Sequence, residues 1–228
     1  MARSISPSAA RWISSAAAVS HWSNALNGIS VKTILLTLLL TLVGCSEQKE
    51  LTYIPPEAVI LAFGDSLTHG VGSRNGGDYP TQLEQLTGRR VINAGVSGET
   101  TAEGLQRLPA LLDQHQPALL ILLEGGNDIL RNLDRAQLKQ NLSQMISLAK
   151  SQNIDVVLIA VPEKNLFSAS APLYQELAEE QQLVIEPEIV ASLLHDNRFK
   201  SDPVHFNNLG YQQLALRLSE LLKEHNAL

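Results

Sequence analysis

Short runs of apolar residues alternate along the chain with longer stretches that have the apolar spacing of helices. Five runs have the length of strands: Val59–Phe63, Val91–Ala94, Leu119–Leu123, Asp155–Val161 and Leu183–Ile185. Continuous apolar runs are typical of strands that are buried on both faces. Strands of this kind, separated by helices of ten or more residues, predict a parallel sheet covered on both sides.

Helical spacing of apolar residues fills the stretches between these runs. The predicted helices are Tyr79–Leu86, Glu103–Leu112, Arg135–Gln152, Leu173–Gln181 and Asn208–Glu224. Pro80 is acceptable in a first helical turn, and Asp134 is suited to cap the helix that follows it. The pattern predicts one α/β domain over residues 58–228, built as a three-layer α/β/α sandwich. In such folds ligands bind beyond the carboxyl ends of the strands, so functional residues are expected in the loops after them.

The first 44 residues differ in kind from the rest, because they contain three basic residues and no acidic one. The apolar run Ile34–Val43 is shorter than the roughly 20 residues that a membrane-spanning helix needs. It has the proportions of the apolar region of a signal peptide. Residues 1–44 are therefore predicted to be a signal peptide. About thirty residues precede its basic end, which favours a translation start near Val31.

The signal peptide is followed by Cys45, the only cysteine of the chain. Leu42-Val43-Gly44-Cys45 resembles the lipobox of bacterial lipoproteins, which implies that Cys45 is lipidated and that acyl chains hold the protein on a membrane. Residues 45–57 then form a polar, lipidated tether. The following Ser46 resembles the address of outer-membrane lipoproteins, so the predicted location is the bacterial cell envelope, at the outer membrane and facing the periplasm. The alternative is an incidental cysteine after an ordinary leader.

Composition narrows the choice of partners. The net charge is −6 and the sequence pI is about 5.5, which argues against nucleic acid, because such partners need a basic face. Charged residues make up 18% and hydrophobic residues 44% of the chain, as in ordinary globular domains. Aromatic residues are only 4%, which leaves the core to aliphatic side chains.

The first predicted strand runs into Gly64-Asp65-Ser66-Leu67. A serine where a helix begins has free backbone N–H groups near it, and these can stabilise a developing oxyanion. Ser66 is therefore a candidate nucleophile, with a plain helix cap as the alternative. The loop lacks the Gly-Lys-Ser/Thr ending of a phosphate-binding loop, and the chain has no Gly-x-Ser-x-Gly elbow.

The loops after the second and third strands supply candidate oxyanion donors. Gly98 can bring its N–H close to a bound oxygen, because it has no side chain in the way. Asn127 carries a neutral amide donor, which holds an oxyanion without adding a charge. Taken singly, each residue also has a purely structural interpretation, Gly98 as a turn glycine and Asn127 as an ordinary loop residue.

Asp202 precedes His205 by three positions, just before the last helix. Residues three apart in a turn lie within about 7 Å, so the aspartate can reach the histidine and orient its ring. The other ring nitrogen would then take the proton of a serine. The sequence shows no further His, Cys or carboxylate cluster with His205, so neither a metal nor a cofactor is expected.

The four blocks around Ser66, Gly98, Asn127 and His205 resemble those of the SGNH/GDSL hydrolases, over a stretch from Val59 to His225. The similarity is greatest to the arylesterase/thioesterase I/lysophospholipase L1 group of Gram-negative bacteria. It rests on Leu105–Leu112, Gln114–Pro117 and Gly125–Asp128.

This resemblance implies a flavodoxin-like parallel sheet of five strands. It also implies Ser66 as nucleophile, His205 as base and Asp202 as its partner, with the Ser66 N–H, the Gly98 N–H and the Asn127 side chain as oxyanion hole. The expected activity is hydrolysis of acyl esters, such as lysophospholipids, fatty acyl esters or thioesters. The acyl pocket is expected along residues 129–133 and 163–174. Two alternatives remain: a carbohydrate O-acetyl esterase of the envelope, and a non-catalytic lipoprotein that serves as a binding module.

Overall fold

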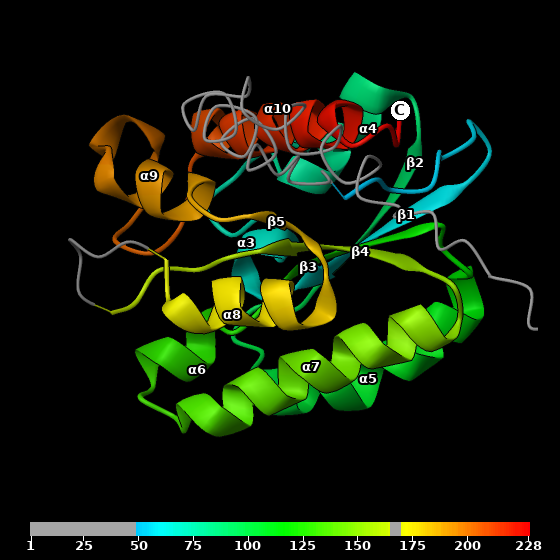
Figure 1. The fold of residues 1–228 in the computed structure, drawn as a ribbon. Coiled ribbons are helices and arrows are strands. Elements are labelled where there is room, and N and C mark those ends of the chain that lie inside the picture. Colours follow the sequence, from blue (N-terminus) through cyan, green and yellow to red (C-terminus); the bar gives the residue numbers. More distant parts are fainter. Residues whose placement is uncertain (1–48, 165–169) are drawn as a thin grey trace, which may run out of the picture. The chain divides into compact units, whose positions relative to one another are not determined.

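The computed structural model describes residues 49–164 and 170–228. Within them, five parallel strands form one sheet in the order β2-β1-β3-β4-β5 (Figure 1). The strands are β1 Val59–Gly64, β2 Arg90–Gly95, β3 Leu119–Leu123, β4 Asp155–Ile159 and β5 Val184–Glu186. The predicted parallel sheet is confirmed. The predicted signal peptide and the lipidation of Cys45 lie outside the described residues.

Helices cover both faces of the sheet and make the outer layers of the sandwich. Those of seven or more residues are α4 Tyr79–Thr87, α5 Thr101–His115, α7 Arg135–Ser151, α8 Pro172–Gln181, α9 Ile189–His195 and α10 Asn208–Glu224. Helices α4, α9 and α10 lie on one face, and α5, α7 and α8 lie on the other (Figure 1). The three-layer α/β/α architecture is therefore confirmed.

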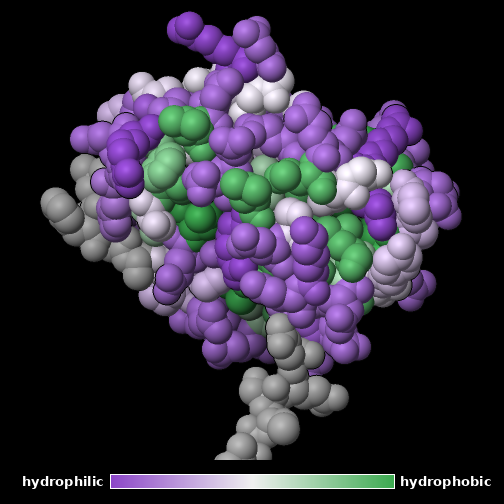
Figure 2. All heavy atoms as spheres, turned by 90° about the horizontal axis from the view of Figure 1, so that it is seen from above, coloured by the Kyte–Doolittle hydropathy of each residue, from purple (hydrophilic) through white to green (hydrophobic). Residues whose placement is uncertain are grey.

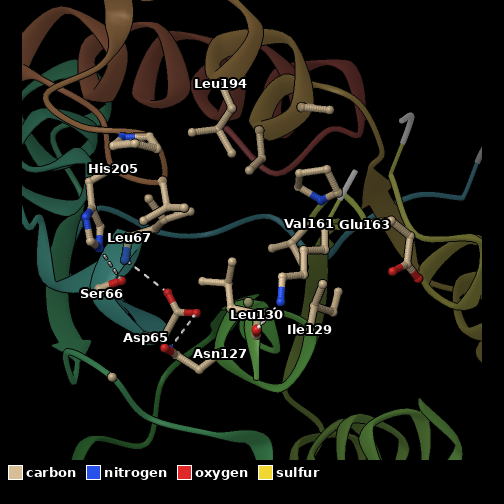
Figure 3. A pocket seen from close by; sticks show the side chains of 18 of the residues that line it. Asp65, Ser66, Leu67, Asn127, Ile129, Leu130, Val161, Glu163, Leu194 and His205 are labelled. Atoms are coloured by element: carbon tan, nitrogen blue, oxygen red, sulfur yellow. Dashed lines mark hydrogen bonds between the residues drawn. The ribbon is translucent and has the colours of Figure 1, made fainter. Parts of the chain in front are cut away.

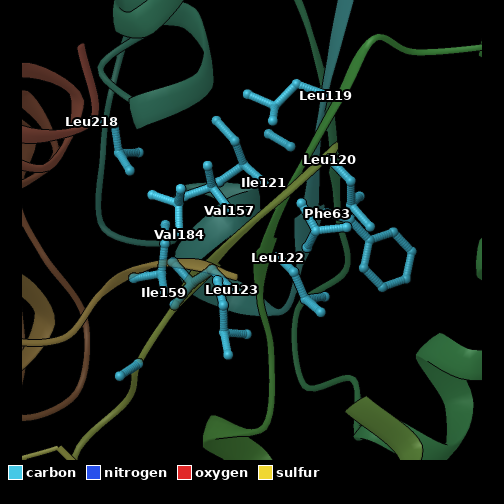
Figure 4. Packing of buried hydrophobic residues seen from close by; sticks show 14 of the residues in the cluster. Phe63, Leu119, Leu120, Ile121, Leu122, Leu123, Val157, Ile159, Val184 and Leu218 are labelled. Atoms are coloured by element: carbon cyan, nitrogen blue, oxygen red, sulfur yellow. The ribbon is translucent and has the colours of Figure 1, made fainter. Parts of the chain in front are cut away.

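Aliphatic side chains of the central strands form the core (Figure 4). Every residue of β3 is at most 1% exposed, and Ile60–Phe63 of β1 are fully buried. A fully buried aliphatic or phenylalanine side chain contributes about 1.5–3 kcal/mol relative to exposure. The continuous apolar runs of the sequence are thus explained by a sheet that has helices on both sides.

Polar residues at the helix starts fix where the helices begin. Asp134 accepts hydrogen bonds from the backbone N–H groups of Ala136 and Gln137, as its position before α7 predicts. Helix α5 begins two residues earlier than the apolar spacing predicts, because Thr100 and Glu103 form a capping box. The predicted start at Glu103 was therefore wrong by one half-turn.

Two short helices were not predicted, α6 Gly126–Leu130 and α9. Each is too short for helical spacing to stand out in a window of ten or more residues. The sequence of α9 does carry a signal, because its apolar residues fall one turn apart and it follows Pro187. Both helices border the candidate site described below.

Part of the predicted tether belongs to the folded domain. Leu51 is 6% and Ile54 is 1% exposed, and their backbone N–H groups donate to the carbonyl oxygens of His225 and Ala227. Burial of these two apolar side chains stabilises the attachment of this segment to the domain, whereas a tether would leave them exposed to water. The prediction of a tether over residues 45–57 therefore needs correction from residue 49 onward.

The surface over α4, α9 and α10 is mostly hydrophilic, and its hydrophobic residues lie in separate patches between hydrophilic ones (Figure 2). Within residues 49–164 and 170–228, no helix combines the length and the apolar character needed to cross a bilayer.

Candidate active site

The candidate site lies at the carboxyl ends of the central strands. In a parallel sheet of order 2-1-3-4-5, the strand order reverses between β1 and β3, and ligands bind in the crevice at this switch point. Ser66 follows β1, Gly98 follows β2 and Asn127 follows β3. All three line one pocket of about 300 Å³. The topology therefore brings together loops that are separated by about thirty residues each.

The turn after β1 presents Ser66 to this pocket. A Cβ atom on Gly64 would lie 1.9 Å from the Leu123 carbonyl oxygen, so only glycine allows β1 and β3 to approach here. Asp65 then caps the four-residue helix α3 Ser66–His69, because its Oδ1 accepts the Leu67 N–H at 3.0 Å. Ser66 is thereby held at the first position of a helix, as the sequence predicted.

Ser66, His205 and Asp202 form a continuous hydrogen-bonded chain. Ser66 Oγ lies 2.9 Å from His205 Nε2, and His205 Nδ1 lies 2.7 Å from Asp202 Oδ2 (Figure 3 shows the Ser66–His205 contact). With Nδ1 protonated, the ring donates to the carboxylate and accepts from the serine hydroxyl. This is the arrangement in which an imidazole can take a proton from a nucleophile.

A local turn holds Asp202 in place. Its Oδ1 accepts the backbone N–H groups of Val204 and His205, each at 2.9 Å, while Oδ2 faces the ring. Burial acts to raise the pKa of Asp202, but the hydrogen bonds from Val204 and His205 outweigh it, so the pKa lies below its usual value. The carboxylate therefore stays ionised, which suits a group that stabilises a charged imidazole.

The other candidate donors border the serine. Gly98 has a φ of 82°, a left-handed conformation that favours glycine, and it lines the pocket next to Ser97. Asn127 Nδ2 donates to the Glu99 carbonyl oxygen at 2.9 Å. This bond uses one of the two amide N–H groups and leaves the second beside the pocket. Among the described residues, the other hydrogen bond of this amide is a weak one of 3.5 Å to Asp65 Oδ2.

A buried carboxyl group lies directly behind the candidate nucleophile. Asp65 is 3% exposed, and burial raises its pKa to about 6, although the Leu67 N–H and the charge of His205 act to lower it. It bridges the start of α3 and the Asn127 side chain of α6 (Figure 3). Asp65 was not among the predicted site residues, although it stands between the candidate nucleophile and an oxyanion donor.

A second buried carboxyl group, Glu124, follows β3 and precedes helix α6, which carries Asn127. Its side chain is fully buried, and its Oε2 atom has no hydrogen-bond partner among the described residues. Burial, aided by the nearby charges of Asp65 and Glu99, raises the pKa of Glu124 well above its usual value. The Glu124 carboxyl group therefore keeps its proton to a higher pH in the folded protein than in the unfolded chain.

Replacement of Glu124 by glutamine is expected to stabilise the protein above neutral pH. The unfolded chain loses the Glu124 proton above a pKa of about 4.5, whereas the folded protein keeps it, so wild-type stability falls as pH rises from that value. Glu124→Gln cannot ionise and should lose this fall, with a gain relative to wild type of about 1.4 kcal/mol for each pH unit over which the folded protein alone keeps the proton.

Urea unfolding at several pH values between about 5 and 8 measures this difference. The exposed Glu220→Gln serves as control and should follow the wild-type profile. Parallel profiles for Glu124→Gln and wild type would contradict the raised pKa of Glu124.

Apolar side chains form the far side of the pocket (Figure 3). They are Ile129, Leu130, Val161, Pro162, Val190, Ala191, Leu194, Pro203 and Val204, together with Leu67 beside the serine. Of the two stretches predicted to line it, Ile129, Leu130, Glu163 and Lys164 do so, and residues 165–169 lie outside the described residues.

The last residue of each predicted lining stretch, Leu133 and Tyr174, does not line the pocket. Leu133 is 43% exposed and is not among the lining residues, while Tyr174 is fully buried and donates its hydroxyl to the Glu124 carbonyl oxygen. Helix α9 contributes instead, through Val190, Ala191 and Leu194. This contribution was missed together with the helix itself.

Comparison with known proteins gives a family match. The model of the GDSL-like lipase/acylhydrolase family matches residues 62–213, which is more than half of the chain and includes all five candidate site residues. A region of 156 residues, 65% of the chain, is 33% identical to thioesterase 1/protease 1/lysophospholipase L1 of Escherichia coli and covers 75% of that protein.

Two further relatives agree with this match. Esterase TesA of Pseudomonas aeruginosa is 37% identical over 127 residues, which are 54% of this chain and 63%, less than two thirds, of that protein. Among solved structures, AlinE4, an esterase of the SGNH-hydrolase family, superposes with a TM-score of 0.59 at 34% identity, over 74% of this chain and 96% of that one.

Proposed function

The chain belongs to the GDSL-like lipase/acylhydrolase family, and we propose that it is a serine esterase that hydrolyses medium-chain acyl esters or thioesters, lysophospholipids among them. One observation carries the proposal. A serine in contact with a histidine–aspartate pair opens on an apolar pocket, and two neutral donors lie beside it. Binding alone would need the pocket but not the hydrogen-bonded chain, which weighs against a non-catalytic module.

The proposed reaction has two steps. His205 Nε2 takes the proton of Ser66 as Oγ attacks the ester carbonyl carbon, and the negative charge passes to the carbonyl oxygen. The Ser66 N–H, the Gly98 N–H and the Asn127 amide stabilise this oxyanion, each by about 3 kcal/mol of barrier if typical. The alcohol or thiol then leaves with the proton from His205. An acyl group remains on Ser66.

Water completes the cycle. His205 takes a proton from a water molecule, which attacks the acyl carbonyl, and Ser66 recovers its proton as the carboxylic acid leaves. Asp202 stabilises the charged imidazole that exists during both steps.

The pocket supports a substrate with an apolar acyl chain. At about 30 Å³ per group, the share of a water molecule in the liquid, a volume of about 300 Å³ holds roughly ten methylene-sized groups. The side of the pocket opposite Ser66 is largely aliphatic, which favours an alkyl chain over an acetyl group.

Hydrolysis of p-nitrophenyl esters from acetyl to palmitoyl tests this proposal, with Ser66→Ala protein as the blank. Turnover per enzyme is expected to peak at chains of about six to ten carbons, because longer chains exceed the pocket. Activity confined to acetyl would favour the carbohydrate O-acetyl esterase. A folded protein without activity on any ester would favour the binding module.

A narrowed pocket should move this optimum. Leu194 of α9 points into the pocket (Figure 3), so Leu194→Trp is expected to lower kcat/KM for octanoyl esters about tenfold or more and to spare butyryl esters. Leu209→Trp is the matched control, because Leu209 is 55% exposed and lies outside the lining. An unchanged optimum in Leu194→Trp would show that the acyl chain binds elsewhere.

The same proposal extends to location. The lipobox-like Leu42-Val43-Gly44-Cys45 supports a lipid anchor and with it a location in the cell envelope. The negative net charge of the chain weighs against a nucleic-acid partner. Labelling of expressing cells with a fatty-acid analogue checks this part, because a Cys45→Ser chain should lose the label and separate from the membrane fraction.

A further inference from the structure

One arginine outside the pocket contacts two of the three segments that carry the oxyanion donors and is linked to the third through Glu99. Arg107 of α5 forms a bidentate ion pair with Glu99, through Nε to Oε1 at 2.8 Å and Nη2 to Oε2 at 2.5 Å. The Glu99 side chain is only 5% exposed. A buried carboxylate with this partner is fixed in position more firmly than an exposed one.

The ion pair reaches the asparagine through the backbone of Glu99. The carbonyl oxygen of this residue accepts the Asn127 amide at 2.9 Å. An amide that is anchored through one N–H has its plane set, and the direction of its second N–H is set with it. Displacement of Glu99 would therefore turn Asn127 away from the oxygen that it is proposed to bind.

The same guanidinium also contacts the two strands that lead to Gly98 and to Ser66. Its Nη2 donates to the Ala94 carbonyl oxygen at 3.0 Å, at the end of β2 where the Gly98 loop begins. Its centre lies 4.2 Å from the ring centroid of Phe63, three residues before Ser66 on β1. Arg107 is thus linked to the loops of Ser66, Gly98 and Asn127 without lining the pocket.

We propose that Arg107 is a positioning residue of the oxyanion hole, which acts through Glu99 on Asn127. This inference rests on the proposed hydrolytic function. A group that binds substrate would change KM, whereas a group that aligns a transition-state donor lowers kcat at nearly constant KM. Misplacement of a donor by about 1 Å lowers turnover by up to about a hundredfold.

A double-mutant cycle between Arg107→Gln and Asn127→Ala tests the inference with a p-nitrophenyl ester of medium chain length. In the wild-type background, Arg107→Gln is expected to lower kcat about 10- to 100-fold with KM within about twofold. In the Asn127→Ala background the same change should cost about twofold or less, because the donor that Arg107 positions is already gone. Arg107→Lys should restore part of kcat.

Two controls separate positioning from loss of stability. Arg217→Gln breaks a comparable pair, in which Arg217 Nε lies 2.6 Å from a Glu186 carboxylate that is 5% exposed, and it should leave kcat unchanged. The pair Arg107→Gln with Glu99→Gln avoids an unpaired buried charge and should show the same loss of kcat in a folded protein.

The experiments distinguish a failure of the proposed function from a failure of the proposed role of Arg107. Turnover that survives in Ser66→Ala would overturn the proposed function itself. If turnover depends on Ser66 but Arg107→Gln keeps its kcat, or lowers it equally with and without Asn127, the positioning role of Arg107 is wrong while the function stands.

Discussion

Ser66→Ala protein is expected to lose ester hydrolysis by about a millionfold in kcat and to keep its fold. In other serine hydrolases the nucleophile and its base act as one unit, and removal of either costs about as much as removal of both. Within residues 49–164 and 170–228, the hydrogen bond of the Ser66 Oγ atom is the one to His205 Nε2, so the change should alter the free energy of unfolding by less than about 1 kcal/mol.

Single-turnover kinetics and labelling with a fluorophosphonate measure this loss. The wild-type protein should gain the mass of one phosphonyl group, and Ser66→Ala should gain none. Ser147→Ala on the exposed face of α7 is the control and should behave as wild type. Addition of His205→Ala to Ser66→Ala should reduce kcat no further. Residual turnover in a preparation free of host esterases would contradict the assignment of Ser66.

The sheet could be predicted because parallel strands that are buried on both faces appear in the sequence as continuous apolar runs. Leu119–Leu123 was predicted with the bounds that the structure shows, since five apolar residues in a row are stable only where helices cover both faces. The last helix, Asn208–Glu224, was also predicted with its observed bounds, from an apolar stripe four turns long. Helix α9 has only about two turns, so its apolar residues are too few to distinguish a helix from a loop that covers the core.

In the candidate site, too, contacts between residues close in sequence could be predicted, whereas contacts that depend on tertiary packing could not. The contact of Asp202 with His205 could be predicted because three residues separate them, and the strand-end rule placed Ser66, Gly98 and Asn127 on one edge. The contact of Arg107 with Glu99 could not be predicted, because it depends on how α5 packs beside the end of β2.

Contacts between loops add a second layer that the sequence does not reveal. The Asp128 carboxylate accepts the Thr101 N–H at 2.9 Å and its hydroxyl at 2.6 Å, which ties the start of α5 to α6. Its neighbour Asn127 binds Glu99. Two adjacent residues of α6 thus bind the end of the loop after β2 and the start of α5. A single sequence gives no means to pair residues that lie 27 or 28 positions apart by geometry alone.

Asp202→Asn is expected to lower kcat by about ten-thousandfold, the second largest loss among the changes considered. The asparagine oxygen can still accept the N–H groups of Val204 and His205, so the turn should persist. Its amide, however, would donate to Nδ1 and favour the ring tautomer with the proton on Nε2, which cannot accept from Ser66. The loss of the negative charge also removes the stabilisation of the imidazolium.

Comparison with Asp202→Ala separates the turn from the charge. The alanine variant loses the turn contacts as well, so its thermal midpoint should fall while that of Asp202→Asn stays near wild type. Asp196→Asn is the matched control, because Asp196 accepts the Arg198 N–H in a similar turn far from Ser66 in sequence and outside the pocket lining. Its kcat should not change. If Asp202→Asn kept kcat within about tenfold of wild type, the carboxylate would serve only the turn, and Ser66 and His205 would act as a dyad.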